Sequence, residues 1–182
     1  GVDLEEFNKN KIKYKNKDTD LDDNNIFKII YTGSLGKANA LYRVIEVAKI
    51  IMEKNINDIK FYIFGNGPEK EKLENYVVKN GIKNVIFKGK VEKIYIPNIL
   101  SKGNLNLFSL EYLPNLFKYG LSPNKMFDYF ASGKPTLSNV ECGYDMLKKY
   151  NCGITIKGGS ARALAEGILK FYNMPQKEYD TY

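Results

Sequence analysis

The sequence predicts an α/β domain with a Rossmann-like, doubly wound parallel sheet. Short apolar runs that end near glycine or polar residues alternate with longer segments in which apolar residues recur every three or four positions. Short apolar runs are typical of buried parallel strands, and the longer periodic segments are typical of amphipathic helices. Regular alternation of the two implies right-handed crossovers between parallel strands.

The expected elements follow one another along the chain. The first strand is expected at 26–31, shortly before Gly33, and a helix with one apolar stripe is expected at about 39–54. The later strands are expected at 60–64, 85–88, 105–110, 136–138 and 153–156. The later helices are expected at 68–80, 95–101, 123–132, 143–149 and 160–172.

The N-terminal part of the chain differs in composition from the rest. Residues 8–25 contain a lysine run followed by an aspartate run and few apolar residues, which is typical of a solvated linker. We therefore expect residues 1–25 to be a linker or flexible surface segment and residues 26–182 to form one folded domain. The sequence does not begin with Met, so we expect it to be part of a longer chain.

Charge and composition exclude several kinds of site. The chain has a formal net charge of +7 and no histidine, which excludes His-based triads and His metal sites. The positive charge suits an anionic ligand or an anionic membrane surface, although abundant lysine is equally typical of proteins from AT-rich genomes. Cys142 and Cys152 lack a C-x-x-C spacing, so we expect two small buried thiols in a reducing compartment. With no signal peptide and no apolar run of membrane-spanning length, a cytoplasmic location is expected.

Candidate site residues are expected in the loops that follow the strands, because ligands of doubly wound sheets bind beyond the carboxyl ends of the strands. The first such loop contains Gly33, Ser34, Gly36 and Lys37. Glycine there lets backbone N–H groups approach a phosphate, and Lys37 adds positive charge. An ordinary tight turn explains the pattern equally well. The Gly-Asn-Gly turn at 65–67 lacks the third glycine of a dinucleotide fingerprint, so NAD binding is not expected.

The stretch 122–135 is the most informative part of the sequence. Ser122 is expected to cap a helix with Pro123 at its first position, which leaves free N–H groups that attract phosphate. Lys125 and Asp128 are three residues apart and lie on one face, where the lysine can bind phosphate and the carboxylate can accept two ribose hydroxyls. The alternative is a capped surface helix with an exposed ion pair between these two residues, and the pattern alone favours it.

Five segments, in order along nearly the whole chain, together resemble glycosyltransferase family 4, whose members have the two-domain GT-B fold. They are 1–7 (GVDLEEF), 31–36 (YTGSLG), 64–69 (FGNGPE), 85–91 (VIFKGKV) and 122–135 (SPNKMFDYFASGKP). The first resembles the passage that links the two GT-B domains, and the others resemble parts of the C-terminal, nucleotide-sugar-binding domain. The resemblance implies that an N-terminal, acceptor-binding domain is absent from this chain.

The resemblance also implies roles for individual residues. The loop from Gly33 to Gly36 would approach the donor diphosphate, and Gly89, Lys90 and Val91 would border the base through their backbone. The start of the later helix, with Ser122, Pro123, Asn124 and Lys125, would hold the diphosphate. Asp128, at a position that is usually Glu in the family, would accept the ribose hydroxyls. No metal ion or other cofactor is implied.

The sequence departs from the family pattern at two places. The E-x7-E pair of the family would have its first member at Gly120, so either Glu111 or another loop residue replaces it or that sugar contact is absent. The arginine that commonly follows the loop glycine is Ser34 here, and Lys37 is the nearest counterpart of a later family lysine. The missing arginine, the GSLG loop and the Ser122 helix resemble the subgroup that builds O-antigen and capsular polysaccharides.

The triplet Asp18-Thr19-Asp20 matches the D-x-D motif by which another glycosyltransferase class holds a metal ion. It lies in the charged segment, away from the end of any expected strand. We therefore expect solvated aspartates there and no metal site.

These features imply the donor-binding domain of a retaining glycosyltransferase. The whole enzyme would move a hexose or amino sugar from a nucleoside diphosphate to a lipid-linked or glycan acceptor in surface polysaccharide synthesis. Peripheral association with the inner face of the plasma membrane is expected, and no nucleic acid partner. One alternative is a non-catalytic nucleotide-binding or regulatory module. Another is a GT-B-like epimerase acting on UDP-GlcNAc, whose catalytic histidines have no place in a histidine-free domain.

Overall fold

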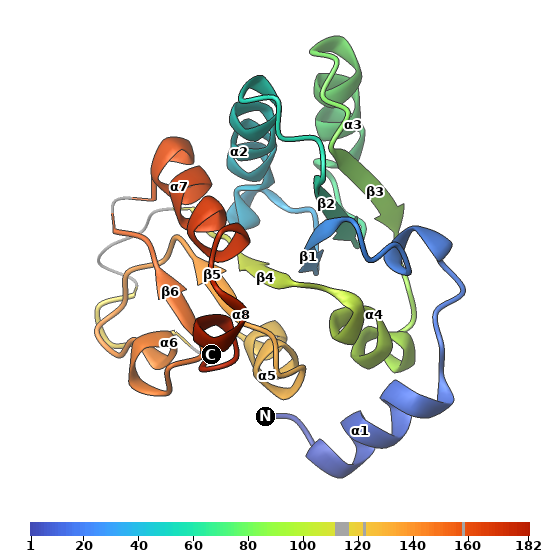
Figure 1. The fold of residues 1–182 in the computed structure, drawn as a ribbon, viewed down its shortest axis with the longest axis vertical. Helices are drawn as coiled ribbons and strands as arrows, with labels where there is room; N and C mark the ends of the chain where they lie inside the picture. Colours follow the sequence, from blue (N-terminus) through green and yellow to red (C-terminus); the bar gives the residue numbers. More distant parts are fainter. Residues whose placement is uncertain (112–116, 122, 158) are drawn as a thin grey trace.

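The computed structural model describes residues 1–111, 117–121, 123–157 and 159–182. Its centre is a six-stranded parallel sheet with the order β3-β2-β1-β4-β5-β6 (Figure 1). The strands are β1 (Phe27–Thr32), β2 (Ile59–Phe64), β3 (Val85–Gly89), β4 (Leu105–Phe108), β5 (Thr136–Ser138) and β6 (Gly153–Thr155). The strand order reverses between β1 and β4, as in Rossmann folds, and this confirms the predicted doubly wound sheet.

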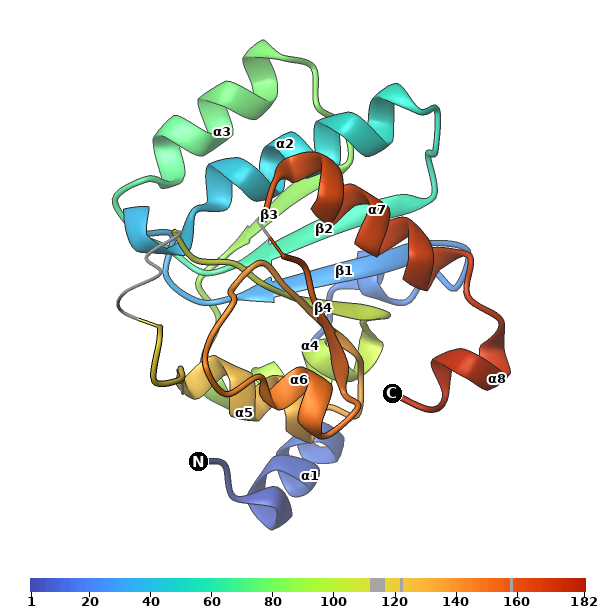
Figure 2. The same ribbon diagram turned by 90° about the vertical axis from the view of Figure 1, so that its left-hand side faces the viewer.

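Helices cover both faces of the sheet (Figure 2). One layer consists of α2 (Leu41–Glu53), α3 (Lys70–Lys79) and α7 (Ala161–Tyr172). The other consists of α1 (Leu4–Lys13), α4 (Ile96–Lys102), α5 (Asn124–Ala131) and α6 (Met146–Lys149). The short helix α8 (Gln176–Tyr179) follows α7, and 3-10 turns occur at η1 (Thr19–Leu21), η2 (Lys37–Asn39) and η3 (Lys93–Tyr95).

Two apolar cores lie on either side of the sheet because successive strand residues point to opposite faces. In β1, Ile29 and Tyr31 belong to the core between the sheet and helices α2 and α7. Ile30 belongs to the core between the sheet and helices α4 and α5. The side chains of Phe61 and Tyr62 in β2 alternate in the same way. The central strands are therefore buried on both faces, which is why they read as continuous apolar runs.

The structure differs from the predicted elements at a few ends. The strand expected to run to residue 110 ends at Phe108. Beyond it, the Leu110 N–H donates to the side-chain oxygen of Asn139 at 3.0 Å, and the Asn139 side-chain NH₂ donates to the Leu110 carbonyl at 2.8 Å. Helix α5 begins at Asn124, with Pro123 at the cap rather than at the first helical position. The helix expected at 143–149 begins only at Met146, and α8 was not expected. Neither cysteine is fully buried, and both thiols are free.

The prediction of a linker or flexible surface segment at residues 1–25 needs correction. Helix α1 is capped by Asp3, whose carboxylate accepts the N–H groups of Glu5 and Glu6 at 2.9 and 3.0 Å. Phe7 is only 3% exposed, and α1 packs beside α4 (Figures 1 and 2). The segment is an ordered part of this domain, while its role as an interdomain connection stays a prediction.

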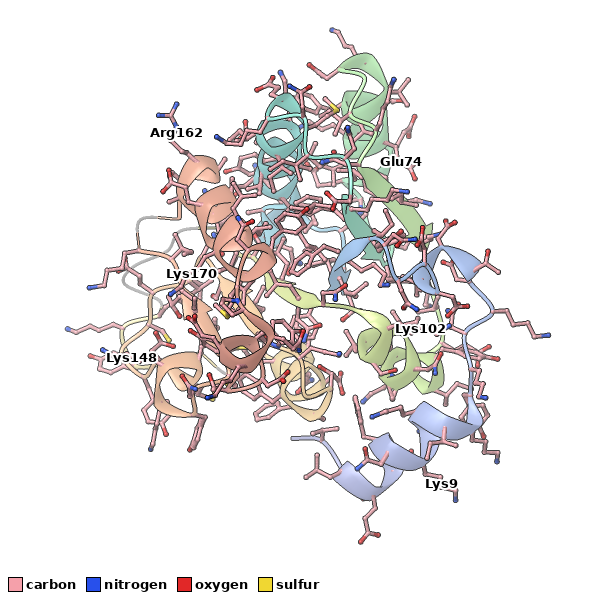
Figure 3. The ribbon with its side chains drawn as sticks, in the orientation of Figure 1. Lys9, Glu74, Lys102, Lys148, Arg162 and Lys170 are labelled. Carbon is pink, nitrogen blue, oxygen red and sulfur yellow. The ribbon has the colours of Figure 1, made fainter. Side chains whose placement is uncertain are left out.

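The chain between α1 and β1 is also held against the domain. The amide of Asn98 on α4 accepts from the Asn16 N–H at 2.8 Å and donates to the Lys11 carbonyl at 3.0 Å. Lys102 reaches from the end of α4 toward this segment (Figure 3) and pairs with Asp22 at 2.7 Å. None of the helices in the described ranges is long and apolar enough to cross a lipid bilayer.

Candidate functional site

A cavity of about 790 Å³ lies beyond the carboxyl ends of β1, β2 and β3, next to the start of α5. It adjoins the point between β1 and β4 where the strand order reverses, which is where ligands bind in open α/β sheets. The lining residues come from four segments, which are 32–34, 64–67, 90–96 and 124–128. They are Thr32, Gly33, Ser34, Phe64, Gly65, Asn66, Gly67, Lys90, Val91, Glu92, Lys93, Ile96, Asn124, Lys125 and Asp128.

The floor of this cavity is made of closely packed backbone. The Gly33 N–H donates to the Phe64 carbonyl at 2.9 Å, and the Gly65 N–H donates to the Gly89 carbonyl at 2.8 Å, so the strand ladder continues into the loops. A Cβ at position 65 would lie 1.7 Å from the Gly33 carbonyl oxygen, and Gly65 has a φ of +151°. Only glycine is compatible with this approach.

Backbone N–H groups lie at the cavity on two sides. Among the described residues, no acceptor is found for the N–H groups of Ser34, Asn124 and Lys125, whereas those of Gly33 and Leu35 are bonded within the protein. Pro123, which precedes α5, makes no side-chain cap hydrogen bond. Free N–H groups at a helix start, together with the positive end of its dipole, bind anions.

Lys125 supplies a cation at the junction of these loops. Its Nζ lies 2.7 Å from Oδ1 of Asn39 and 3.0 Å from the Tyr31 hydroxyl oxygen. A Cβ at Gly33 would lie 3.0 Å from the same nitrogen. Burial lowers the pKa of Lys125 to about 8. Among the described residues no carboxylate pairs with this amine.

Asp128 lies one turn further along α5 and lines the same cavity. It is half-buried, and burial raises the pKa of its carboxyl group, although Lys93 and the N-terminal amine oppose that shift. The alternative expectation of an exposed ion pair between Lys125 and Asp128 is not met, since the ion pairs of the described residues do not include it. Lys125 instead contacts the Tyr31 hydroxyl of β1, and the charge of Lys93 acts on Asp128 from the loop after β3.

The structure brings most of the predicted site residues together at this cavity. Those that line it are Gly33, Ser34, Lys90, Val91, Asn124, Lys125 and Asp128. Those that are described but lie outside its lining are Gly36, Lys37, Gly89 and Pro123. Lys37 opens the turn η2 with an exposed side chain, so the positive charge nearest Gly33 comes from Lys125. Ser122 lies outside the described residues, and its predicted role as a cap stays a prediction.

The sequence did not single out several neighbours of the site. Lys93 follows the third strand, so its position after a strand end was a usable signal. Asn39 was hidden, because its contact with Lys125 joins residues 86 apart in the chain. Tyr31 reads as a core residue of β1, although its hydroxyl reaches the Ser34 carbonyl at 2.8 Å.

Glu111 lies away from the cavity lining. Its carboxylate is 3.9 Å from the Arg43 guanidinium and 3.4 Å from the Tyr42 hydroxyl, and its N–H donates to the Ala38 carbonyl at 2.9 Å. The contacts therefore hold Glu111 against η2 and the start of α2. The replacement of the carboxylate missing at Gly120 by Glu111 or another loop residue stays a prediction.

The D-x-D triplet is only partly solvated, because the Asp18 side chain is 19% exposed and that of Asp20 is 58% exposed. Nζ of Lys88 on β3 lies 2.9 Å from the Asp18 carboxylate and 2.6 Å from that of Asp20, so both aspartates are bound near the end of a strand. Within the described ranges, no group of three or more His, Cys, Asp or Glu residues is arranged to hold a metal ion.

Comparisons with known proteins give similar folds. Solved structures similar to this chain include S. aureus TarM in a complex with UDP, with a TM-score of 0.70 and 19% identity, and Anabaena HepE in complex with UDP and glucose, with 0.71 and 16%. A third is the C-terminal domain of LpcC, a glycosyl transferase group 1 family protein from Francisella tularensis, with 0.69 and 17%. A search of curated proteins finds no match.

The matched share differs among these structures. The similarity covers 86% of this chain and 30% of TarM, 100% of this chain and 48% of HepE, and 100% of this chain and 92% of the LpcC domain. The chain thus spans less than half of TarM and HepE. The shared fold agrees with the predicted C-terminal half of a GT-B glycosyltransferase.

The sequence itself also matches a family. Residues 26–174 of the 182-residue chain match the family described as Glycosyl transferases group 1. The matched range begins where the first strand was expected and includes every segment that lines the cavity. The chain belongs to the Glycosyl transferases group 1 family.

Proposed function

We propose that the cavity binds the nucleoside diphosphate part of a sugar donor and that this chain is the donor-binding domain of a retaining glycosyltransferase. The observation that carries the proposal is Lys125, a cation without a carboxylate partner among the described residues, held beside the Gly33–Ser34 turn at the start of α5. An anion that enters this corner gains both the charge and the helix-start donors.

The donor would lie across the cavity from α5 to the loop after β3. Its diphosphate would bind next to both the Gly33–Ser34 turn and Lys125, and its ribose hydroxyls would donate to Asp128. The base would lie along Lys90 and Val91. As the sugar leaves, charge that develops on the diphosphate would be stabilised by Lys125 and the N–H groups of α5, without a metal ion.

The proposal extends to the substrates of the whole enzyme. The TarM and HepE structures contain UDP, which favours a uridine donor carrying a hexose or N-acetylhexosamine. A lipid-linked or glycan acceptor in surface polysaccharide synthesis would bind to a second domain, and the enzyme would work in the cytoplasm or peripherally at the inner face of the membrane. We expect the 182-residue chain alone to bind the donor without glycosylating an acceptor.

Backbone amide NMR tests the location of the bound nucleotide. Adding UDP, GDP or ADP to ¹⁵N-labelled protein should shift the resonances of Ser34, Lys90, Val91 and Lys125. The resonance of Lys170 on α7, outside the cavity lining, serves as the internal control. Shifts confined to the region of Lys170, or no shifts with any of the three nucleotides at millimolar concentration, would refute the assignment of the site.

A further inference from the structure

The Lys125 amine is held by groups from three different parts of the fold. Asn39 in η2 accepts from Nζ at 2.7 Å, and the Tyr31 hydroxyl at the end of β1 accepts from it at 3.0 Å. Nζ also lies 4.5 Å from the centre of the Tyr31 ring and 5.7 Å from that of Phe108 on β4. Every one of these neighbours is uncharged, so the amine is fixed in place without being neutralised.

Tyr31 joins the amine to the loop that would bind phosphate. Its hydroxyl donates to the Ser34 carbonyl at 2.8 Å while accepting from Lys125. The same oxygen therefore fixes both the Gly33–Ser34 turn and the amine above it. Because the Tyr31 hydroxyl contacts both, Ser34 and the Lys125 amine are held at the lining of the same cavity.

We propose that Asn39 and Tyr31 are positioning residues that hold the Lys125 amine beside the Gly33–Ser34 turn and, being uncharged, leave its positive charge available to the donor diphosphate. This inference rests on the function proposed above and adds two residues that the sequence did not single out. Neither residue needs to touch the nucleotide. Both would act through Lys125.

The identity of residue 39 is the sensitive point of this arrangement. An aspartate there has nearly the same shape as asparagine, but it would form an ion pair with Lys125 and repel a diphosphate. The other charged or titratable groups of the described residues on the surrounding elements include Tyr129 and Asp128 on α5, Lys90, Glu92 and Lys93 after β3, Lys37 in η2, and Glu111, whose N–H bonds to the Ala38 carbonyl of η2. These are common to all the variants below, so a change in the titration of Lys125 reports on residue 39 or residue 31.

The titration of Lys125 measures the proposed contact directly, without any nucleotide. Protein labelled with ¹³C at lysine Cε is titrated between pH 6.5 and 11 by NMR, and the Lys125 signal is assigned by its absence in Lys125→Met. We expect a midpoint near 8 in the parent protein. In Asn39→Asp the midpoint should rise by more than about one pH unit, because an opposite charge in hydrogen-bond contact favours the ammonium form.

Asn66→Asp is the matched control for added charge. Asn66 lines the same cavity, but its side chain accepts from the Gly67 N–H and is not among the groups bonded to Lys125. Asn66→Asp adds the same negative charge without direct contact with Lys125, so it should raise the titration midpoint of Lys125 clearly less than Asn39→Asp does. Asn39→Ala and Tyr31→Phe each remove one acceptor and should lower it, which keeps the test decisive if Asn39→Asp does not fold.

Nucleotide affinity then separates this inference from the proposed function. At pH 7.5, Asn39→Ala should weaken binding of the nucleoside diphosphate by about three- to tenfold, and Asn39→Asp by more than about tenfold. Equal Lys125 midpoints in the parent, Asn39→Asp and Asn39→Ala would overturn the positioning role even if UDP binds well. Expected midpoints without binding of UDP, GDP or ADP would instead reject the phosphate role of the amine and the proposed function, while the contact itself stood.

Discussion

Lys88 and Asp18 are 70 residues apart in the sequence, and their side chains meet in an ion pair with a Nζ–Oδ2 distance of 2.9 Å. The same ammonium group lies 2.6 Å from the Asp20 carboxylate and 5.6 Å from the centre of the Tyr62 ring. Since Asp18 and Asp20 precede β1 while Lys88 belongs to β3, the pair fastens the N-terminal segment to the edge strand of the sheet.

Replacing Lys88 with Met should lower the free energy of unfolding by about 1–3 kcal/mol, because Asp18 would be left half-buried without its partner. The Lys88 and Asp18 side chains are only 16% and 19% exposed, which sets this pair apart from an ordinary surface salt bridge. Urea denaturation at pH 7 measures the change. Lys9→Met is the control, since Lys9 points outward from α1 (Figure 3) and should change stability little. Equal effects of the two substitutions would contradict the fastening role of Lys88.

The loss of stability in Lys88→Met should depend on pH in a defined direction. The hydrogen bond from Lys88 lowers the pKa of Asp20 below its ordinary value of 3.8. A carboxylate whose pKa is lowered by folding stabilises the protein above that ordinary value and stops doing so as the pH falls through the folded-state pKa. The difference in melting temperature between the parent and Lys88→Met should therefore be full at neutral pH and shrink below pH 3.8. A difference that grew on acidification would exclude the carboxylates as the cause.

Asp128→Ala should weaken nucleotide binding by about ten- to a hundredfold, since it removes a charge-assisted acceptor for the ribose hydroxyls. Asp18→Ala provides the contrast, because that carboxylate pairs with Lys88 and should affect stability but not affinity. Calorimetric titration and thermal melts of each variant separate the two effects. If Asp128→Ala bound nucleotides as the parent does while Asp18→Ala did not, the ribose site would have to be moved to the D-x-D segment.

Lys125→Met should stabilise the ligand-free protein by about 1–3 kcal/mol at pH 7, because Met fills the same space without a buried charge. The sign follows from the pKa of Lys125, which folding lowers from 10.5 to about 8. Such a group opposes folding fully below pH 8 and progressively less as the pH rises to 10.5. Melting curves of the parent and the variant should therefore converge between these two pH values. A Lys125→Met protein that is less stable than the parent at pH 7 would contradict an uncompensated charge.

Nucleotide binding should not depend on a metal ion, since the proposed diphosphate site consists of N–H groups and a lysine. Affinity should be the same, within error, in EDTA and in millimolar Mg²⁺ or Mn²⁺. A strict requirement for either ion would contradict the proposed mode of phosphate binding.

The order of strands and helices could be predicted because it depends on local patterns. The continuous apolar run that contains Ile29, Ile30 and Tyr31 indicates a strand buried on both faces. The apolar stripe that includes Val44 and Ile51 indicates a helix buried on one face. Helix α1 escaped prediction because Phe7 is its only buried residue, although the Asp3 cap and the acidic first turn were visible signals.

The candidate site could be predicted only where a motif marks it. The Lys125 and Asp128 pattern was recognisable within one helix. The contacts of Lys125 with Asn39 and of Lys88 with Asp18 depend on how the sheet brings distant loops together, and no local period records that. Lys37 was a candidate because it follows the first strand in the sequence. Its position in the sequence could not show that it lies outside the cavity lining.

Isothermal titration calorimetry of the parent protein and of Lys125→Met with UDP, GDP and ADP, at pH 7.5 in EDTA, tests the central claim most directly. At least one nucleotide should bind the parent with a Kd of roughly 10 μM to 1 mM, and Lys125→Met should bind it at least about tenfold more weakly. The account would be contradicted if none of the three bound the parent, or if Lys125→Met bound them as tightly as the parent does.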